Sequence, residues 1–385
     1  MSTIPLSLYI HVPWCVKKCP YCDFNSHALK DSLPEARYLD ALIEDLIIDL
    51  PYVQQRPIKS IFFGGGTPSL ISPQGIESLL QRISKLVVFA PNIEITLETN
   101  PGTVEHFELA DYKTAGINRI SLGAQSFDDQ KLKLLGRIHC ASETLAAVDK
   151  LHRINFNSFN IDLMHGLPQQ TLTQALSDLS TAIDCNAPHL SWYQLTIEPN
   201  TFFHKYPPAL PNDDLTWQIQ TQGEQLLAAA GFQHYEVSAF AKPGNHCQHN
   251  INYWEFGDYI GIGAGAHGKI TDLKTFAIQR TWKTRTPTDY LNPDKQFLAG
   301  ISAVAKDQLP SEYMLNRLRL FTPLDTQQFQ QYTGLTDNSI AKGLNSACQQ
   351  GLMQQSNKLY NLTHLGKCFL NNVVQMFLTD EGSHD

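Results

Sequence analysis

The sequence predicts an α/β protein: an open, partial (βα)6 barrel of the TIM type, followed by a smaller, mainly helical C-terminal domain. Three observations lead to this prediction. Strand-like apolar runs alternate with helical patterns six times in the N-terminal half. Hydrophobic residues make up 42% of the chain and charged residues only 17%, which allows a sizeable core and argues against disorder. The length of 385 residues suits two or three domains of roughly 150 residues.

The predicted strands are short apolar runs, and helical patterns separate most of them. The runs span residues 6–12, 58–63, 93–98, 118–123, 159–164 and 190–197. Helices are predicted over 35–50, where Leu39, Leu42 and Leu46 recur at helical spacing, and over 75–88. Successive β-then-α units form a parallel sheet covered by helices. Six units are fewer than the eight of a closed barrel, so we expect an open barrel. A doubly wound sheet remains the alternative, because periodicity does not distinguish the two.

A second unit is predicted beyond a polar stretch that contains Pro287 and Pro293. We therefore divide the chain into a barrel core with a following segment (1–280), a linker (281–296) and a mainly helical domain (297–385) that is rich in Gln, Leu and Asn. Residues 382–385 are expected to form a frayed tail.

The charge balance and the N-terminal sequence exclude several classes of protein. With 29 Lys and Arg against 37 Asp and Glu, the net charge is −8, so no nucleic-acid partner is expected. No positive charge precedes the first apolar residues, as it would in a secretory signal. No run approaches the roughly 20 apolar residues of a membrane span. We expect a cytoplasmic protein without a transmembrane segment.

Three of the eight cysteines crowd into one segment, Cys15-x3-Cys19-x2-Cys22. A zinc site usually takes ligand pairs from two separate segments, and no second pair stands out. One alternative is a glutaredoxin-like redox pair of Cys19 and Cys22, which leaves Cys15 unexplained. The other is a cysteine cluster with a purely structural role. Three closely spaced thiolates suit three corners of a [4Fe–4S] cube, whose fourth iron then stays open. We predict these three cysteines as cluster ligands.

A C-x3-C-x2-C motif after the first strand resembles the radical S-adenosylmethionine (SAM) superfamily. The resemblance implies that the amino and carboxylate groups of SAM chelate the fourth iron, and that one electron cleaves SAM to a 5′-deoxyadenosyl radical. The core of that superfamily is also a partial (βα)6 barrel. The resemblance thus favours the open barrel.

Polar and glycine motifs follow the later strands, where ligands of such folds bind. Glycines after the second strand let backbone approach a ligand, a carboxylate can bind an ammonium, and a guanidinium can bind a carboxylate. The motifs resemble those of the coproporphyrinogen-oxidase-like branch of radical SAM proteins. That resemblance implies that Tyr9 packs near the cluster. It assigns SAM contacts to Gly65, Gly66, Thr67, Glu98, Gln125, Arg137 and Asp162.

Within this branch the sequence resembles the HemW haem chaperones more than the oxygen-independent coproporphyrinogen III dehydrogenases. The dehydrogenases carry a further cysteine two positions after the third cluster cysteine, where this chain has Phe24, and an N-terminal extension, whereas eight residues precede Tyr9 here. The segment from His249 to Trp254 also matches the H-N-x-x-Y-W motif of HemW. The residues expected to bind haem are His249, Asn250, Tyr253 and Trp254.

An imidazole can ligate haem iron, and aromatic rings can cover a porphyrin face. His249 is the first candidate ligand, and His246, Cys247 and His267 are alternatives. We interpret the glycine-rich segment 259–268 as close packing rather than as a wall of the haem site.

We therefore expect a haem chaperone that carries a [4Fe–4S] cluster and SAM and passes haem to acceptor haemoproteins, membrane proteins included. The alternative is the dehydrogenase, a radical SAM oxidative decarboxylase, and a third hypothesis is an enzyme acting on RNA. Whether the chain is an enzyme stays open: SAM either tunes haem transfer or is cleaved slowly.

Overall fold

The computed structural model describes residues 4–103, 107–156 and 158–378. The predicted tail at 382–385 lies outside these residues. Within them, no helix is long and apolar enough to cross a membrane.

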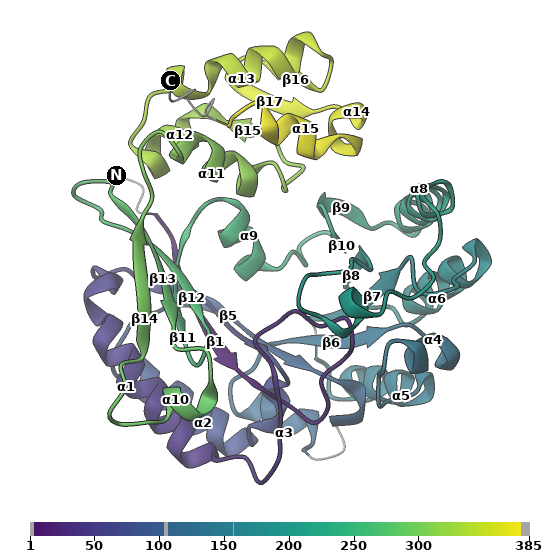
Figure 1. Ribbon diagram of the computed structural model, residues 1–385, viewed down its shortest axis with the longest axis vertical. Coiled ribbons are helices and arrows are strands. Elements are labelled where there is room, and N and C mark those ends of the chain that lie inside the picture. Colours follow the sequence, from purple (N-terminus) through teal and green to yellow (C-terminus); the bar gives the residue numbers. More distant parts are fainter. Residues whose placement is uncertain (1–3, 104–106, 157, 379–385) are drawn as a thin grey trace.

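Six parallel strands lie side by side in chain order and form the centre of a large sheet (Figure 1). They are β1 (Leu6–Val12), β4 (Ile58–Gly65), β5 (Phe89–Thr99), β6 (Arg119–Gln125), β7 (Phe159–His165) and β8 (His189–Gln194). Each overlaps one of the six predicted runs. The pairs between neighbours are all parallel, which confirms the predicted α/β fold with a partial barrel.

Both edges of this sheet are extended. Beyond β1 come β11 (Asp258–Ile262), β12 (His267–Thr271), β13 (Ile278–Lys283) and β14 (Leu298–Ala303). Beyond β8 come β10 (Ala239–Ala241) and β9 (Gln233–Glu236). Only β11 in these extensions runs parallel to its barrel neighbour; the other pairs are antiparallel.

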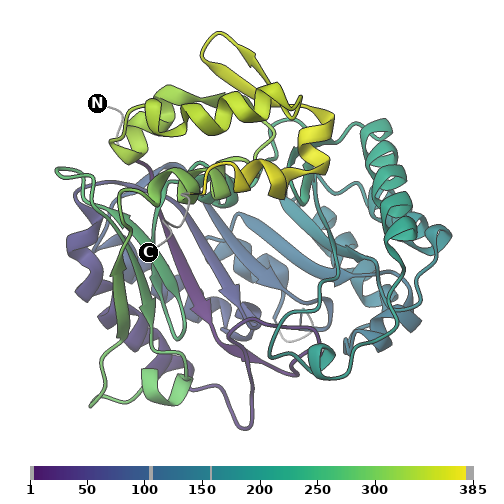
Figure 2. The ribbon, with the colours of Figure 1, turned by 45° about the horizontal axis from the view of Figure 1, so that its top comes forward.

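Helices cover the outer face of the parallel strands (Figures 1 and 2). They are α1 (Glu35–Val53), α2 (Pro73–Ser84), α3 (Leu109–Thr114), α4 (Asp129–Leu134), α5 (Ala141–Arg153), α6 (Leu172–Asp184) and α8 (Asp213–Ala229). Shorter elements are β2 (Trp14–Cys15), β3 (His27–Ala28), α7 (Phe202–Lys205), α9 (Gln248–Trp254), α10 (Pro287–Tyr290) and the 3-10 turns Pro68–Leu70 and Pro101–Thr103. The predicted helices at 35–50 and 75–88 correspond to α1 and α2.

Side chains alternate along the parallel strands, and the alternation separates the core from the interior of the barrel. The apolar set, such as Ile10, Ile61 and Leu97, is buried in one cluster with the covering helices. The intervening positions, such as Tyr9 and Glu98, line cavities. Successive strand residues point to opposite faces, so the helices pack on the apolar face, and polar and aromatic side chains line a hollow barrel interior.

The C-terminal domain has its own core and a small three-stranded sheet. Its elements are α11 (Leu309–Arg317), β15 (Leu324–Asp325), α12 (Thr326–Thr333), α13 (Asn338–Gln349), β16 (Met353–Ser356), β17 (Leu359–Leu362), α14 (His364–Cys368) and α15 (Leu370–Gln375). Ile4, just before β1, belongs to this core. The domain therefore sits at the amino ends of the parallel strands, with α9 between (Figure 1).

The stretch 281–296, predicted as a linker, differs from that prediction. It begins inside β13 and contains α10, and β14 beyond it pairs with β13 in the large sheet. The sheet thus continues to Ala303. β14 is an edge strand with mostly exposed side chains, and its short run is interrupted by Gly300 and Ser302, so the sequence does not mark it as part of the large sheet.

Candidate functional site

The loop after β1 folds back on itself and carries the three clustered cysteines. Trp14 and Cys15 pair with His27 and Ala28 in the small parallel sheet of β2 and β3. Lys18 Nζ donates hydrogen bonds of 3.2 Å to two backbone carbonyls near the end of the loop. These bonds close the loop around the thiols.

The three thiols are free and line one cavity of about 390 Å³, which we call the cysteine cavity. Burial raises the pKa of the Cys15 thiol. Arg137 Nη1 donates to Cys19 Sγ at 3.7 Å, and Cys22 Sγ lies 3.6 Å from Ser26 Oγ. A guanidinium beside a sulfur stabilises the thiolate, which is the ligating form.

Within the described residues, no three His, Cys, Asp or Glu side chains converge on a point where they could hold one metal ion. Each thiolate of a [4Fe–4S] cube binds a different iron, so its ligands need not converge. Three free thiols around one cavity, with a cation beside one of them, fit the cluster.

Gly65, the last residue of β4, and Gly66 are required by close contacts within the chain itself. A Cβ atom at Gly66 would lie 2.4 Å from the carbonyl oxygen of Trp14, and one at Gly65 would lie 2.6 Å from the His11 ring. Thr67 N donates to Trp14 O at 2.7 Å. We expected these glycines to admit a ligand; the structure shows that Gly66 admits the backbone of Trp14 and Gly65 admits the ring of His11.

Two carboxyl groups face the cysteine cavity from β5 and β7, which lie on either side of β6. Glu98 Oε2 accepts from Gly65 N at 3.2 Å. Asp162 accepts from Ser121 Oγ at 3.0 Å and from Asn160 Nδ2 at 2.7 Å. Burial, and then the proximity of Asp162, raises the pKa of Glu98 to about 8, and burial raises the pKa of Asp162. A cationic ligand between them would offset both effects, since an ammonium favours the ionised carboxylate.

Arg137 and Gln125 complete the lining of the cysteine cavity. Arg137 Nη2 donates to Gly123 O at 2.7 Å and to Asn100 Oδ1. Gln125 has a left-handed backbone (φ 70°), and its Oε1 accepts from Tyr193 OH at 2.9 Å. Such strain in a non-glycine residue is typical of functional sites. Every predicted cluster and SAM residue except Tyr9 lines this cavity: Cys15, Cys19, Cys22, Gly65, Gly66, Thr67, Glu98, Gln125, Arg137 and Asp162.

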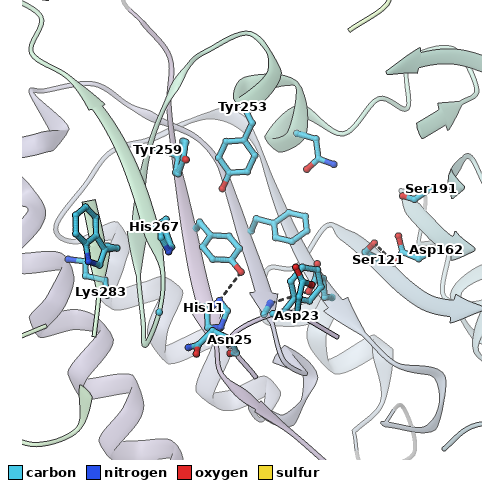
Figure 3. A pocket seen from close by; sticks show the side chains of 18 of the residues that line it. His11, Asp23, Asn25, Ser121, Asp162, Ser191, Tyr253, Tyr259, His267 and Lys283 are labelled. Atoms are coloured by element: carbon cyan, nitrogen blue, oxygen red, sulfur yellow. Dashed lines mark hydrogen bonds between the residues drawn. The ribbon is translucent and has the colours of Figure 1, made fainter. Parts of the chain in front are cut away.

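A larger cavity of about 860 Å³ continues from the first into the barrel (Figure 3). Its aromatic lining consists of Tyr9, Phe24, Phe62, Tyr253, Trp254, Tyr259 and Trp282, and we call it the aromatic cavity. The two cavities share the lining residues Phe24, Gly65, Glu98, Ser121, Asp162, Ser191, Asn250 and Trp254. A molecule in one is therefore in direct reach of a molecule in the other.

The predicted haem motif forms α9, at the amino ends of the strands and opposite the cysteine loop (Figure 1). Glu94 on β5 accepts from Gln248 N at 3.1 Å and from His249 N at 2.9 Å, which satisfies free N–H groups of the first helical turn. We expected the functional motifs at the carboxyl ends. The motif reaches the site from the other end instead, and Asn250, Tyr253 and Trp254 line the aromatic cavity.

His249 is set apart from the rest of its motif. It is 1% exposed and lines neither cavity. Its Nδ1 lies 2.9 Å from Ser60 Oγ, and its Nε2 lies 3.0 Å from Tyr253 OH. Burial, and then Arg119, lowers its pKa to about 3, so the ring is neutral. With both nitrogens hydrogen-bonded, His249 holds Tyr253 in place.

The glycine-rich segment 259–268 both packs closely and lines the aromatic cavity. A Cβ atom at Gly263 would lie 2.4 Å from His11 O, and one at Gly265 would lie 2.2 Å from Asn25 Nδ2. Asn25 in turn donates to Ala264 O at 2.9 Å. Gly265 and His267 also line the cavity.

Several lining residues were missed from the sequence. They include His11, Asn25, Arg119, Ser121, Asn160, Ser191, Trp282 and Arg285. For those on the parallel strands a signal was present, because polar side chains at every second position of an otherwise apolar strand indicate a polar inner face. Asn25 and Arg285 lie in loops, where no such pattern exists.

Comparison with known proteins gives a family model and full-length relatives. The radical SAM superfamily model matches residues 9–179. The "Heme chaperone HemW" of Escherichia coli K12 is 51% identical over 376 residues, 98% of this chain and 99% of the relative. The protein of the same name from Haemophilus influenzae is 52% identical over 381 residues, again 98% and 99%. That from Bacillus subtilis is 31% identical over 389 residues, 97% and 99%.

Among solved structures, the coproporphyrinogen III oxidase HemN of Escherichia coli, a radical SAM enzyme, aligns with a TM-score of 0.82. The alignment covers 97% of this chain and 90% of that one, at 24% identity. At this identity the similarity extends to the fold alone.

Proposed function

Because this chain belongs to the radical SAM superfamily and, within it, to the HemW family of haem chaperones, we propose that it binds haem and passes it to acceptor haemoproteins. The observation that carries the proposal is the aromatic cavity of about 860 Å³ that continues into the cysteine cavity. A pocket of this size, lined by aromatic rings and a few polar groups, suits a large planar ligand.

The thiolates of Cys15, Cys19 and Cys22 would hold the [4Fe–4S] cluster, which when bound supplies one electron and an open iron site for SAM. Around it, the carboxylate of Glu98 would accept hydrogen bonds from an ammonium, and the guanidinium of Arg137 would pair with a carboxylate. The remaining contacts to SAM are assigned to Gly65, Gly66, Thr67, Gln125 and Asp162. Since Glu98 and Asp162 face both cavities, the same carboxyl groups would lie next to SAM in one cavity and to haem in the other.

The alternative function is oxidative decarboxylation of coproporphyrinogen III. One lining residue argues against it. Phe24 is 62% exposed and faces both cavities, at the position where a further cysteine would be expected in the dehydrogenases. A phenyl ring provides apolar contact area there and no thiol.

Acceptors include membrane haemoproteins in this proposal, and the chain is proposed to act in the cytoplasm. The support for the compartment is that all eight cysteines are free thiols, as is usual in a reducing environment.

The test compares binding and turnover on one preparation of the full chain, reconstituted with iron and sulfide without oxygen. We expect saturable haem binding, followed by its Soret band, and no decarboxylation of coproporphyrinogen III with SAM and a reductant. Turnover above background would overturn the chaperone function in favour of the dehydrogenase.

A further inference from the structure

Five side chains of types that can ligate haem iron line the aromatic cavity within the described residues. They are Tyr9, His11, Tyr253, Tyr259 and His267. None of the three clustered cysteines lines the aromatic cavity. The haem ligand, if the chain supplies one from this cavity, comes from these five.

Four of the five are committed to other contacts. The phenol of Tyr9 and the Nδ1 atom of His11 lie 2.9 Å apart, and the other nitrogen of His11 lies 2.8 Å from Asn25 O. Tyr253 OH is hydrogen-bonded to His249. Tyr259 OH accepts from Arg280 at 3.1 Å.

The tyrosines also lack the ionised form that binds iron. Burial raises the pKa of Tyr9 and of Tyr253 well above the ordinary value, and burial raises the pKa of Tyr259. A phenol that stays protonated is a poor ligand for iron.

His267 differs from all four. It is the first residue of β12, its side chain is exposed to the cavity, and its ring makes no hydrogen bond to a described residue. Burial, and then the charges of Arg285 and Arg280, lowers its pKa. The ring is therefore neutral near pH 7, which is the form that binds a metal.

The backbone around His267 is fixed, and suitable groups surround the ring. A Cβ atom at Gly261 would lie 2.0 Å from His267 O, so the two strands approach as closely as glycine permits. Trp282 on β13 is paired in register with His267 and lines the same cavity. In Figure 3, His267 and Tyr259 lie on one side of the cavity, across from Ser121 and Asp162.

Charge is also available at this side of the cavity. Arg285 lines it, is exposed, and its side chain makes no hydrogen bond to a described residue. A free guanidinium can bind a propionate carboxylate in bidentate geometry.

We propose that His267, rather than the motif residue His249, is the axial ligand of the iron of haem bound in the aromatic cavity, and that Arg285 pairs with a propionate. This inference rests on the proposed haem-binding function. His249 then acts as a positioning residue, which holds Tyr253 against the cavity.

The test uses two ligands, haem and metal-free protoporphyrin IX, with the full-length wild type and the variants His267→Ala and His249→Gln. An axial ligand acts only through the metal. We therefore expect His267→Ala to weaken haem binding at least about tenfold and to change the Soret band, while protoporphyrin IX binds as in the wild type. Free imidazole should restore the wild-type spectrum, and His249→Gln should keep it.

Each other outcome is decisive. Unchanged haem affinity and spectrum in His267→Ala overturn the assignment, as does loss of the spectrum in His249→Gln alone. Loss of both ligands by His267→Ala also overturns it, because the residue then shapes the cavity and does not bind iron. If the wild type binds neither ligand, the proposed function itself fails.

Discussion

The Nε2 atom of His249 lies 3.0 Å from the phenol oxygen of Tyr253, one helical turn further along α9. The histidine is buried behind the cavity wall, and the tyrosine forms part of that wall. The H-N-x-x-Y-W motif therefore combines a structural residue with lining residues, and its position in the fold separates the two roles.

Replacing His249 with Ala removes two hydrogen bonds and leaves a space beneath Phe62, whose ring lies 5.0 Å from the imidazole centroid. We expect the free energy of unfolding to fall by about 2–3 kcal/mol, measured by chemical denaturation of the cluster-free protein. Tyr253→Phe removes one of the same bonds but no volume, and should cost about 1 kcal/mol. Equal losses for the two variants would show that the imidazole contributes no packing.

Replacing Cys15, Cys19 and Cys22 together with Ala should abolish iron and sulfide uptake during anaerobic reconstitution, because no other thiol lines the cysteine cavity. A matched triple variant of Cys140, Cys348 and Cys368 provides the control and should take up wild-type amounts. Iron and sulfide analysis distinguishes the two proteins. Retention of iron by the first variant would contradict the assignment of the cluster ligands.

The substitution Gly66→Ala should displace the cysteine loop, because the new methyl group would lie 2.4 Å from Trp14 O. We expect a loss of about 1–3 kcal/mol in stability and a lower iron content after reconstitution. Gly102→Ala is the control, since its nearest neighbour would be 3.5 Å away. Normal iron content in Gly66→Ala would indicate that the loop adapts and that the glycine serves only a ligand.

Glu98 should make the ligand-free protein less stable as the pH rises. Burial, and then Asp162, raises its pKa from 4.5 to about 8. Between these values the folded protein keeps a proton that the unfolded chain has released, so stability decreases through this window. Glu98→Gln carries no such proton. The Tm of this variant minus that of the wild type should therefore increase as the pH rises to about 8. Parallel Tm profiles of the two proteins would rule out the raised pKa.

Arg285→Met should weaken haem binding about three- to tenfold, as expected for a partly exposed ion pair. Haem dimethyl ester has no propionate charge, so the wild type and Arg285→Met should bind it equally. The two ligands and two proteins form a double-mutant cycle, which isolates the pairing energy. A coupling energy of zero would show that Arg285 does not pair with a propionate.

Much of the fold was predictable because its signals are local. β1 coincides with the predicted run 6–12, and α1 begins at Glu35, where the predicted helix begins. The cysteine motif is equally local, since its three cysteines lie on one loop. The alternation of polar and apolar residues on β6 and β7 is a local signal too, and it indicates which side chains face the interior of the barrel.

The parts that were not predictable depend on packing between distant segments. The place of α9 at the amino ends of the strands depends on Glu94, which lies more than 150 positions earlier in the chain. The edge strand β14 is short, and its side chains are mostly exposed, so its sequence does not reveal that it pairs with β13. Likewise, the contacts that occupy His249 come from Ser60 and Tyr253, and no spacing rule distinguishes a histidine that supports a tyrosine from one that ligates iron.

The most direct test is a haem titration of the anaerobically reconstituted full chain, followed at the Soret band, with coproporphyrinogen III as competitor in the presence of SAM and a reductant. The account predicts saturable haem binding in the aromatic cavity and a porphyrinogen that is recovered unchanged. Consumption of the porphyrinogen without saturable haem binding would contradict it.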